Sequence, residues 1–442
     1  MIYKNKLIET IKYTVKATSI SPVSIRDNSD FLKIDVLTGK VYIPGSSIAG
    51  AFRNYYESYI NTTCGSDNNR LFGGAETGIS RLVFYDAFLV ENTNKEMLAS
   101  RPGIKIDSEK MSVVSSGLGS KKSGHKFKRQ FLNKGIRFLF SFELNNYEDE
   151  CDFVKTQKEF EDLLRALAVG DISFGSNKMI GYGRFEINSV SKSIFDLRNF
   201  NDMFKYLLKE TKDVEITEDI VNNGYLSSKV HFRIIARATT PLLIKDEVVR
   251  SSDEPDSKNI TDNKGNCIIP GSSLKGVLRS RAEKLAKTFP KIDKQVISNI
   301  FGIESKEDEG CISRFCCFDT EIRDEMKGIY NKIKIDYFTG GVVQNALMNE
   351  ETVMGNMEIE CTFNTFGLEE YESEIGLLLL VIRDLCLEDL NVGSGYAVGR
   401  GYIKASKLTL FDGHEMVYDF DSPDKQVEEQ FNSYISKLMS VG

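Results

Sequence analysis

The stretch "YIPGSSIAG", Tyr42 to Gly50, decides the fold of this chain, because nearly the same nine residues return as "IIPGSSLKG", Ile268 to Gly276. The two copies lie 226 positions apart (Pro270 minus Pro44). Recurrence at a long, fixed offset is the sequence signature of a repeated structural unit. If the two stretches begin two versions of one domain, other landmarks should recur in the same order.

Three further landmarks meet this expectation. They are "RLFGGAETGISRLVFYDAF" (70–88) with "NIFGIESKEDEGCISRFCCFDTEI" (299–322), "IKID" at 104–107 and 333–336, and "FGSNKMIGYGRFEI" (174–187) with "VGSGYAVGRGYIKA" (392–405). The offsets change only as loop insertions would change them. The sequence therefore predicts a tandem duplication, with a first domain over 1–208, a charged and polar linker over 209–229 and a second domain over 230–442.

Composition places the chain among folded soluble proteins. It has 442 residues, of which 41% are hydrophobic and 27% are charged, which suits two domains. No apolar run approaches the roughly 18 residues of a membrane span, and the N-terminus lacks the apolar block of a signal peptide. We therefore expect a cytoplasmic protein with no membrane partner. The absence of a CxxC pair and the presence of only three histidines argue against a zinc site.

The net charge of −7 at first argues against a nucleic-acid partner. Partners respond to local fields, however, and the stretch "KKSGHKFKRQFLNKGIR" (121–137) is strongly basic. A surface with such an asymmetric charge can bind a polyanion. Lys121, Lys126 and Arg129 are accordingly predicted to contact a polyanionic partner.

The order of elements within each half predicts an α+β fold. Residues 5–17 and 228–238 alternate polar and apolar side chains, which is typical of strands. Apolar spacing after each PGSS indicates a helix, for which Ser273 is the expected N-cap. A second helix is expected before each glycine-rich run. Strand, helix, strands, helix, strand predicts two tandem modified ferredoxin-like domains with inserted hairpins and loops.

These motifs resemble the RAMP superfamily of CRISPR proteins, and more narrowly the backbone subunits of type III (Csm/Cmr-type) effector complexes. The resemblance rests on "IPGSSLKG", "IDYFTGGVVQNALMNEETVMG" and "GSGYAVGRG" in the second half; the first half has a basic insert in place of the middle motif. It implies an RNA-recognition-like fold. The implied partners are guide RNA, target RNA and other Cas subunits, including further backbone RAMP subunits and a polymerase-like large subunit.

Each PGSS motif predicts a phosphate contact, because hydroxyls and unpaired N–H groups gather at a helix N-terminus. A simple capped turn is the alternative. The predicted RNA-binding residues of this group are Ser46, Ser47, Arg53, Ser272, Ser273, Lys275 and Arg279.

The glycine-rich runs are predicted to approach RNA closely, with basic side chains adding charge. A tight turn between strands is the alternative. The residues expected to bind RNA here are Lys178, Arg184, Gly393, Gly395 and Arg400.

A hairpin formed by "IDYFTGG" and "ALMNEETVMGN" is expected to project from the second domain. By resemblance to the family, its apolar residues Leu347 and Met348 would separate bases of a guide–target duplex. An edge hairpin in solvent is the alternative.

Two acidic loops precede the PGSS motifs with the same D-x-x-D spacing. Asp27 and Asp30 in the first half match Asp253 and Asp256 in the second, and Asp30 and Asp256 each lie fourteen residues before the proline. The resemblance implies that an acid in this loop cleaves target RNA. Asp27, Asp30, Asp253 and Asp256 are therefore the predicted catalytic residues, and Asp30 and Asp256 are the predicted ligands of Mg²⁺ or Mn²⁺. An acidic loop that merely caps nearby N–H groups is the alternative.

The leading functional hypothesis is a two-copy backbone subunit that holds guide RNA and cleaves complementary target RNA at two positions, as a metal-dependent endoribonuclease. A non-catalytic structural or capping RAMP subunit is one alternative. A guide-precursor-processing endoribonuclease is another, although such enzymes often use histidine, which is scarce here.

Overall fold

The computed structural model describes most of the chain, in which the elements divide into two compact units. The first unit comprises Met1–Ala99, Gln130–Lys178 and Tyr182–Ser228, and the second comprises Ser100–Arg129, Met179–Gly181 and Lys229–Gly442. The described residues are 6–26, 32–60, 71–73, 79–91, 97–104, 106–107, 112–113, 115–116, 123–124, 126–148, 152–222, 224, 227–246, 254–303, 310–344 and 346–440.

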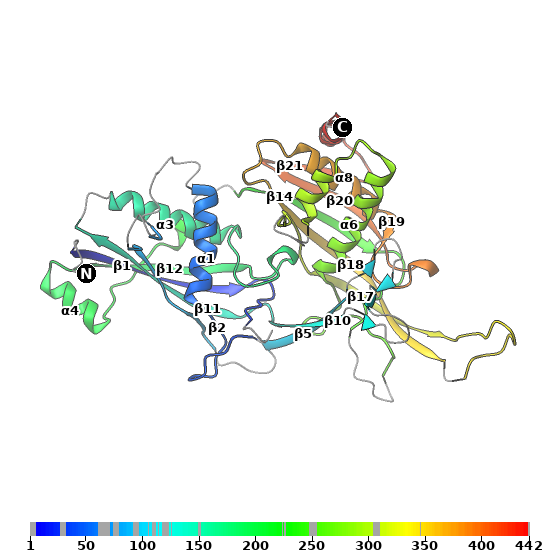
Figure 1. The fold of residues 1–442 in the computed structure, drawn as a ribbon, viewed down its shortest axis with the longest axis horizontal. Helices are drawn as coiled ribbons and strands as arrows, with labels where there is room; N and C mark the ends of the chain where they lie inside the picture. The colour runs from blue at the N-terminus through cyan, green and yellow to red at the C-terminus, as the bar shows by residue number, and fades with distance from the viewer. Residues whose placement is uncertain are drawn as a thin grey trace. The chain divides into compact units, whose positions relative to one another are not determined.

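The first unit is an antiparallel sheet with helices (Figure 1). Its central strand β1 (Leu7–Ser19) pairs with β11 (Arg137–Tyr147) on one side and with β12 (Phe185–Asp196) on the other. β4 (Ala87–Leu89) continues the sheet beyond β11, which gives the order β12-β1-β11-β4. The remaining elements of this unit are β2 (Tyr42–Ile43), α1 (Gly45–Tyr55), η1 (Tyr56–Ile60), β3 (Leu82–Phe84), α3 (Phe153–Ala168), α4 (Phe200–Leu208), β13 (Val214–Glu215) and α5 (Thr217–Val221).

The second unit repeats this order. β14 (Lys229–Ala238) is the central strand and pairs antiparallel with β18 (Met348–Asn364) and β20 (Tyr402–Asp412). β17 (Thr320–Lys332) lies next to β18, so that the order is β20-β14-β18-β17. The remaining elements are β15 (Ile268–Ile269), α6 (Gly271–Thr288), α7 (Lys294–Phe301), β16 (Phe315–Cys317), α8 (Glu372–Cys386), β19 (Leu387–Asn391), η5 (Tyr396–Val398), β21 (His414–Asp419) and α9 (Lys425–Ser440).

A bulge in the central strand pair recurs in both units. The register between β1 and β12 shifts at Lys16/Ala17, and the register between β14 and β20 shifts at Ile235/Ala236. Bulges re-aim a strand and are specific features rather than defects. The shared bulge and the shared strand order confirm the prediction of two tandem α+β domains of the ferredoxin-like kind.

Several short elements lie outside this common plan. β5 (Leu98–Ile104) pairs with β10 (Lys126–Leu132). Two short strand pairs lie between them in the chain: β6 (Ile106–Asp107) with β7 (Ser112–Val113), and β8 (Ser115–Ser116) with β9 (Ser123–Gly124). The segment assigned to a linker contains β13 and α5, and Ile216 and Ile220 within it are buried in the first unit. None of the helices in the described part of the chain could span a bilayer.

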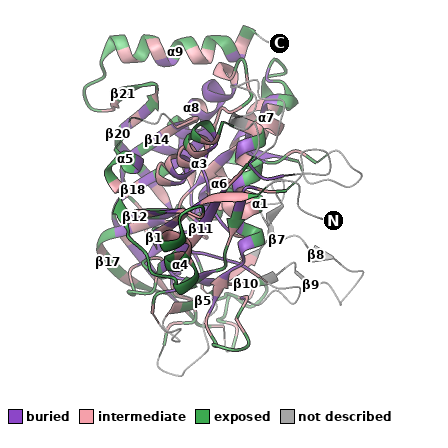
Figure 2. Ribbon diagram, turned by 90° about the vertical axis from the view of Figure 1, so that its left-hand side faces the viewer, coloured by how far each residue is buried: buried purple, intermediate pink, exposed green. Residues whose placement is uncertain are grey.

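Each unit has its own apolar core between sheet and helices, shown in purple in Figure 2. The core of the first unit is rich in phenylalanine, with Phe52 of α1 packed against Phe142, Phe160 and Phe174. Aromatic rings at these separations contribute about 0.5–1.5 kcal/mol per pair beyond the area they bury. The core of the second unit depends instead on the aliphatic helix α8, whose residues from Ile375 to Ile382 are mostly fully buried.

The helix after each PGSS begins earlier than the sequence predicts. α6 starts at Gly271 with Pro270 in the N-cap position, so the assignment of Ser273 as N-cap is wrong. A carboxylate from elsewhere in the unit serves instead: Asp319 accepts a hydrogen bond from the Gly271 N–H at 3.0 Å. The first unit repeats the arrangement with Asp86 and the Gly45 N–H at 2.7 Å.

The first glycine of each motif lets this helix approach a strand closely. A Cβ built on Gly45 would lie 2.4 Å from the Phe84 carbonyl oxygen, and one on Gly271 would lie 2.1 Å from the Cys317 carbonyl oxygen. The motif's last glycine has no such constraint, because a Cβ on Gly50 or Gly276 would meet nothing within 4 Å. The recurrence of this glycine is therefore explained by packing between helix and strand.

These glycines supply matched tests of the duplication. We expect Gly45→Ala and Gly271→Ala each to destabilise the chain by about 1–3 kcal/mol through overpacking. Gly50→Ala and Gly276→Ala should leave stability unchanged or raise it by up to about 1 kcal/mol, because alanine is the better helix former. Denaturant unfolding measures all four variants. Equal effects at the first and last glycine of either motif would contradict the packing explanation.

Candidate nucleic-acid interface

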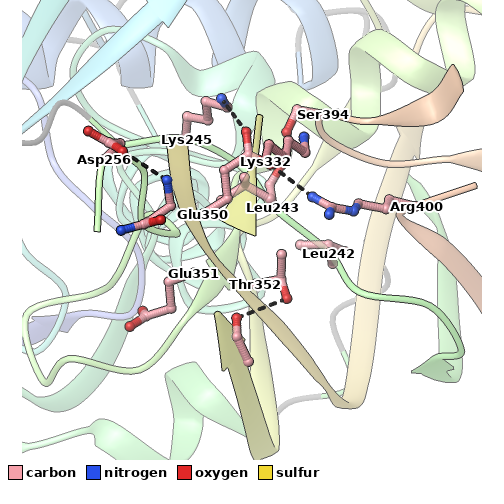
Figure 3. A network of polar contacts seen from close by, with 12 residues as sticks. Leu242, Leu243, Lys245, Asp256, Lys332, Glu350, Glu351, Thr352, Ser394 and Arg400 are labelled. Carbon is pink, nitrogen blue, oxygen red and sulfur yellow. Dashed lines mark hydrogen bonds and ion pairs between the residues drawn. The ribbon is translucent and has the colours of Figure 1, made fainter. Parts of the chain in front are cut away.

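A buried carboxylate in the second unit organises a cluster of polar contacts (Figure 3). Glu350 is only 4% exposed and binds three cations. Its Oε1 lies 2.9 Å from Lys245 Nζ, and its Oε2 lies 2.5 Å from Lys332 Nζ and 2.9 Å from Arg400 Nη1. Glu350 and its three basic partners are called the Glu350 cluster below.

Separate segments of the chain deliver the members of this cluster. Glu350 lies near the start of β18, opposite Tyr330 of β17 in the strand register, and Lys332 ends β17. Lys245 follows β14, where a backbone bridge joins it to Asn259. Arg400 comes from the glycine-rich run, with its guanidinium 4.6 Å from the centre of the Tyr330 ring in a cation–π contact.

The glycine-rich run is held on the end of β14 by its own backbone. The Ser394 N–H and hydroxyl both donate to the Leu243 carbonyl oxygen, at 2.8 and 3.2 Å. Gly393 has a φ of 88°, and a Cβ there would lie 2.5 Å from the same oxygen. Gly395 has a φ of 89° and packs against the Arg400 side chain. Gly393 thus approaches protein backbone and Gly395 approaches side chains of the same run, which is the tight turn of the alternative interpretation.

The Glu350 cluster carries surplus positive charge. Three cations face one carboxylate, which leaves two charges uncompensated within the cluster. Burial raises the pKa of Glu350, but hydrogen bonds from Lys332 and Lys245 and their charges outweigh it and lower the pKa to about 2. The side chains of Lys245 and Lys332 are partly exposed, whereas that of Arg400 is nearly buried. Two ammonium groups therefore remain accessible to an anion.

Asp256 lies beside this cluster, at the start of β18. Its Oδ2 accepts a hydrogen bond from the Asn349 N–H at 2.8 Å, and Asn349 directly precedes Glu350. The following residue, Ser257, forms a parallel bridge with Glu350. The structure thus brings a predicted catalytic acid and Arg400 to neighbouring residues at the start of β18. The contact also has the form expected of an acidic loop that caps an N–H group.

The hydroxyls predicted at the helix N-termini are largely accessible. Ser46, Ser47 and Ser272 are exposed, and Ser273 is half-buried. The aspartates that bind the first N–H of each helix place a carboxylate where the phosphate was expected. Asp86 and Asp319 were visible in the sequence only as a landmark shared by the two repeats.

The basic residues of these helices bind protein atoms. Lys275 Nζ donates to the Met179 carbonyl oxygen at 3.1 Å, to Ser313 Oγ at 2.7 Å and to the Phe315 carbonyl oxygen at 2.8 Å, which occupies all three ammonium donors. Burial lowers the pKa of Lys275. Arg53 Nη2 donates to the Phe72 and Gly73 carbonyl oxygens, each at 2.8 Å, and Arg279 pairs with Glu283 on the helix surface.

The other predicted basic residues lie outside the Glu350 cluster, and those whose side chains are described are half-buried. Burial lowers the pKa of Lys178, and the Arg184 side chain covers Gly170 in the first unit. Arg129 is half-buried, and Lys126 lies in β10. Asp27, Asp30, Asp253 and Lys121 lie outside the described residues.

The projecting hairpin exists, but its strands differ from the prediction. β17 ends at Lys332 and pairs there with Met348, so the strand opposite "ALMNEETVMGN" is β17, and "IDYFTGG" forms the turn at the tip (Figure 1). Leu347 and Met348 are both exposed. Tyr337 and Phe338 at the tip, each 93% exposed, are more prominent and were not singled out from the sequence.

Within the described ranges, no group of three or more His, Cys, Asp or Glu side chains is arranged to hold a metal ion. Asp256 offers a hard oxygen ligand beside the cluster. Mg²⁺ commonly uses one or two carboxylates together with substrate phosphates and water, so a site at Asp256 would depend on bound RNA.

We expect Glu350→Gln to lower stability, because the neutral amide leaves three neighbouring cations unneutralised, with a cost of about 3–5 kcal/mol for a broken buried pair. Since the folded-state pKa is lowered, the stabilisation is complete above the ordinary pKa of 4.5 and is lost as pH falls toward about 2. Unfolding free energies between pH 7 and 2 should therefore fall more steeply for wild type than for Glu350→Gln.

Glu351→Gln is the matched control, because Glu351 points away from the cluster in Figure 3. It should change neither stability at pH 7 nor the acid dependence appreciably. Parallel pH curves for wild type and Glu350→Gln would show that the cluster does not hold Glu350 ionised.

Comparison with a protein-family model agrees with the fold. The family model described as the RAMP superfamily matches residues 16–186 and again 235–404. No curated protein sequence matches the chain. One solved structure with local similarity is the cryo-EM structure of the Type III-B Cmr-beta bound to cognate target RNA, at 17% identity and a TM-score of 0.31, covering 42% of this chain and 61% of that chain. The two family matches span most of the sequence and fall one in each repeat, so this chain belongs to the RAMP superfamily and contains two copies of its domain.

Proposed function

We propose that this protein is an RNA-binding backbone subunit of a type III CRISPR effector complex, which holds guide RNA and cleaves complementary target RNA at two positions. The observation that carries the proposal is the Glu350 cluster, with two surplus positive charges, beside Asp256 in a RAMP domain. Guide RNA, target RNA and neighbouring Cas subunits are the proposed partners.

The binding step follows from the chemistry of the cluster. Lys245 and Lys332 each use one donor on Glu350, and each ammonium has three. Glu350 alone cannot neutralise both ammonium groups. Their remaining donors can therefore bind phosphate oxygens. Contacts to the sugar-phosphate backbone fix position without reading sequence, as a subunit that accepts any guide requires.

The apolar hairpin tip supports contact with a duplex. Tyr337 and Phe338 are exposed neighbours whose ring centroids lie 5.5 Å apart. Apolar and aromatic side chains inserted between base steps unstack them. By this proposal the tip separates paired bases near the bound backbone, and Leu347 and Met348 line its base.

The cleavage step proposed for Asp256 is attack of a ribose 2′-hydroxyl on the adjacent phosphate. The 2′-oxygen forms a bond to phosphorus, its proton passes to the carboxylate, and the bond to the 5′-oxygen breaks with protonation of that oxygen. The products are a 2′,3′-cyclic phosphate and a 5′-hydroxyl. Mg²⁺ or Mn²⁺ held by Asp256 would supply further positive charge at the phosphate. Asp30 is proposed to act in the first domain.

A non-catalytic structural subunit is the second candidate. It is favoured by the bond between Asp256 and the Asn349 N–H, which gives the carboxylate a structural role. The experiments below separate the two candidates.

For cleavage, we expect Asp256→Ala and Asp30→Ala each to remove one of two target products in the assembled complex, and the double variant to remove both. Loss of a general base typically slows a reaction about 10²–10⁴-fold. Gel analysis of labelled target RNA, with and without Mg²⁺, is the measurement.

Asp262→Asn is a matched control, because Asp262 lies in the same loop and uses its Oδ1 to accept the N–H groups of Lys264 and Asn266. It should leave both products unchanged. An unaltered product ladder in both single variants would favour the structural subunit.

For binding, Lys245→Ala with Lys332→Ala should weaken guide affinity and flatten its salt dependence by about 1–2 units of slope, because two phosphate contacts are lost. Lys275→Ala should instead lower stability with an unchanged slope, because its ammonium is used on protein acceptors. Filter binding at several salt concentrations measures the slopes. A slope of wild-type size in the double variant would exclude the cluster from the RNA contact.

A further inference from the structure

A nine-residue turn of nearly the same sequence occurs in both units at places that do not correspond in the fold. "KIDVLTGKV" (33–41) and "KIDYFTGGV" (334–342) share their lysine, isoleucine, aspartate, threonine, first glycine and valine. The first copy lies in the connection from β1 to α1, and the second at the tip of the β17–β18 hairpin. Descent from the duplicated domain therefore does not explain the similarity.

The two turns have the same internal hydrogen bonds. Asp35 accepts from the Leu37 N–H at 3.3 Å, the Thr38 N–H at 3.2 Å and the Thr38 hydroxyl at 2.5 Å. In both turns an isoleucine bridges to a valine, Ile34 to Val41 and Ile335 to Val342.

Asp336 repeats these bonds in the second turn. It accepts from the Phe338 N–H at 3.0 Å, the Thr339 N–H at 2.8 Å and the Thr339 hydroxyl at 3.0 Å. These hydrogen bonds lower the pKa of Asp35, chiefly through Thr38, and that of Asp336, chiefly through Thr339.

Each turn presents two adjacent apolar side chains to solvent. Val36 and Leu37 are 96% and 94% exposed, and Tyr337 and Phe338 are each 93% exposed. Single exposed apolar residues are ordinary, but two adjacent ones held at the apex of a fixed turn form a preorganised wedge.

The fold itself does not require an apolar apex. The turn of the second unit that corresponds to the first copy ends at Gly265, five residues before Pro270, as Gly39 lies five before Pro44. This turn is one residue shorter than the first copy, and its apex residues Asn263 and Lys264 follow Asp262 as Val36 and Leu37 follow Asp35. Asn263 and Lys264 are polar and exposed. Val36 and Leu37 thus replace polar residues that the same turn position accepts.

We propose that Val36 and Leu37 form a second base wedge, so that the chain enters a guide–target RNA duplex at two places. This inference rests on the proposed function. The lysines beside each apex favour RNA as the occupant: Lys33 and Lys40 flank the first, and Lys334 precedes the second. Leucine and similar aliphatic side chains wedge between base steps as aromatic ones do, and the adjacent ammonium groups complement the phosphates that line the opened step.

The test uses the full-length chain and guide–target RNA duplexes with 2-aminopurine at successive target positions. Unstacking raises the fluorescence of this base. Wild type should brighten the probe at two separate positions. V36S/L37S should abolish one of them and Y337S/F338S the other, while V36I/L37M keeps both and the polar-turn variant N263S/K264S changes neither.

Thermal unfolding checks that the variants fold, which is expected because the substituted side chains are exposed. Retention of both bright positions in V36S/L37S would overturn the inference. If that variant also loses self-association while the fluorescence pattern is unchanged, the apex is a protein contact instead. Failure of wild type to bind the duplex would overturn the proposed function as well, whereas binding with one bright position would overturn this inference alone.

Discussion

The ion pairs between Glu350 and three basic side chains are the interaction on which the candidate interface depends. One buried carboxylate joins the segment after β14, the base of the β17–β18 hairpin and the glycine-rich run. A buried charge without partners is costly, and cations this close would repel one another without it. The carboxylate therefore fixes the positions of Lys245 and Lys332 and still leaves the cluster positive. A preorganised site of this kind binds an anion without first ordering long, flexible side chains.

The duplication explains which features are shared and where the two units differ. Both units place an aspartate on the first N–H of the helix after PG and use a glycine where that helix meets a strand. These contacts belong to the scaffold. The polar cluster described here belongs to the second unit, and the fold-equivalent of Lys245 in the first unit, Arg26, donates to Ser176 Oγ at 3.4 Å. The scaffold has thus been kept while the surface contacts have changed.

The sequence predicted the architecture well because repeats and periodicity report on backbone and core. The order of elements along each half and the presence of a helix at each PGSS motif could be inferred from spacing, whereas the tight turns of the glycine runs were only the alternative interpretation. The Glu350 cluster could not be inferred, because its members come from 245, 332, 350 and 400 and meet only through the pairing of distant strands. Lys275 shows the converse limit: a lysine beside a helix N-terminus suggests phosphate, yet its ammonium is used within the protein. Asp86 and Asp319 recur in the two repeats, but only the fold shows that each accepts the first N–H of a helix.

Photochemical cross-linking of guide RNA that contains 4-thiouridine, followed by mapping of the linked peptides in the full-length chain, tests the central claim most directly. If the Glu350 cluster faces the guide backbone, cross-links will concentrate on peptides that contain Lys245, Lys332 and the glycine-rich run around Arg400, and they will diminish in Glu350→Gln. Cross-links confined to other parts of the chain, with none altered by that substitution, would contradict the account.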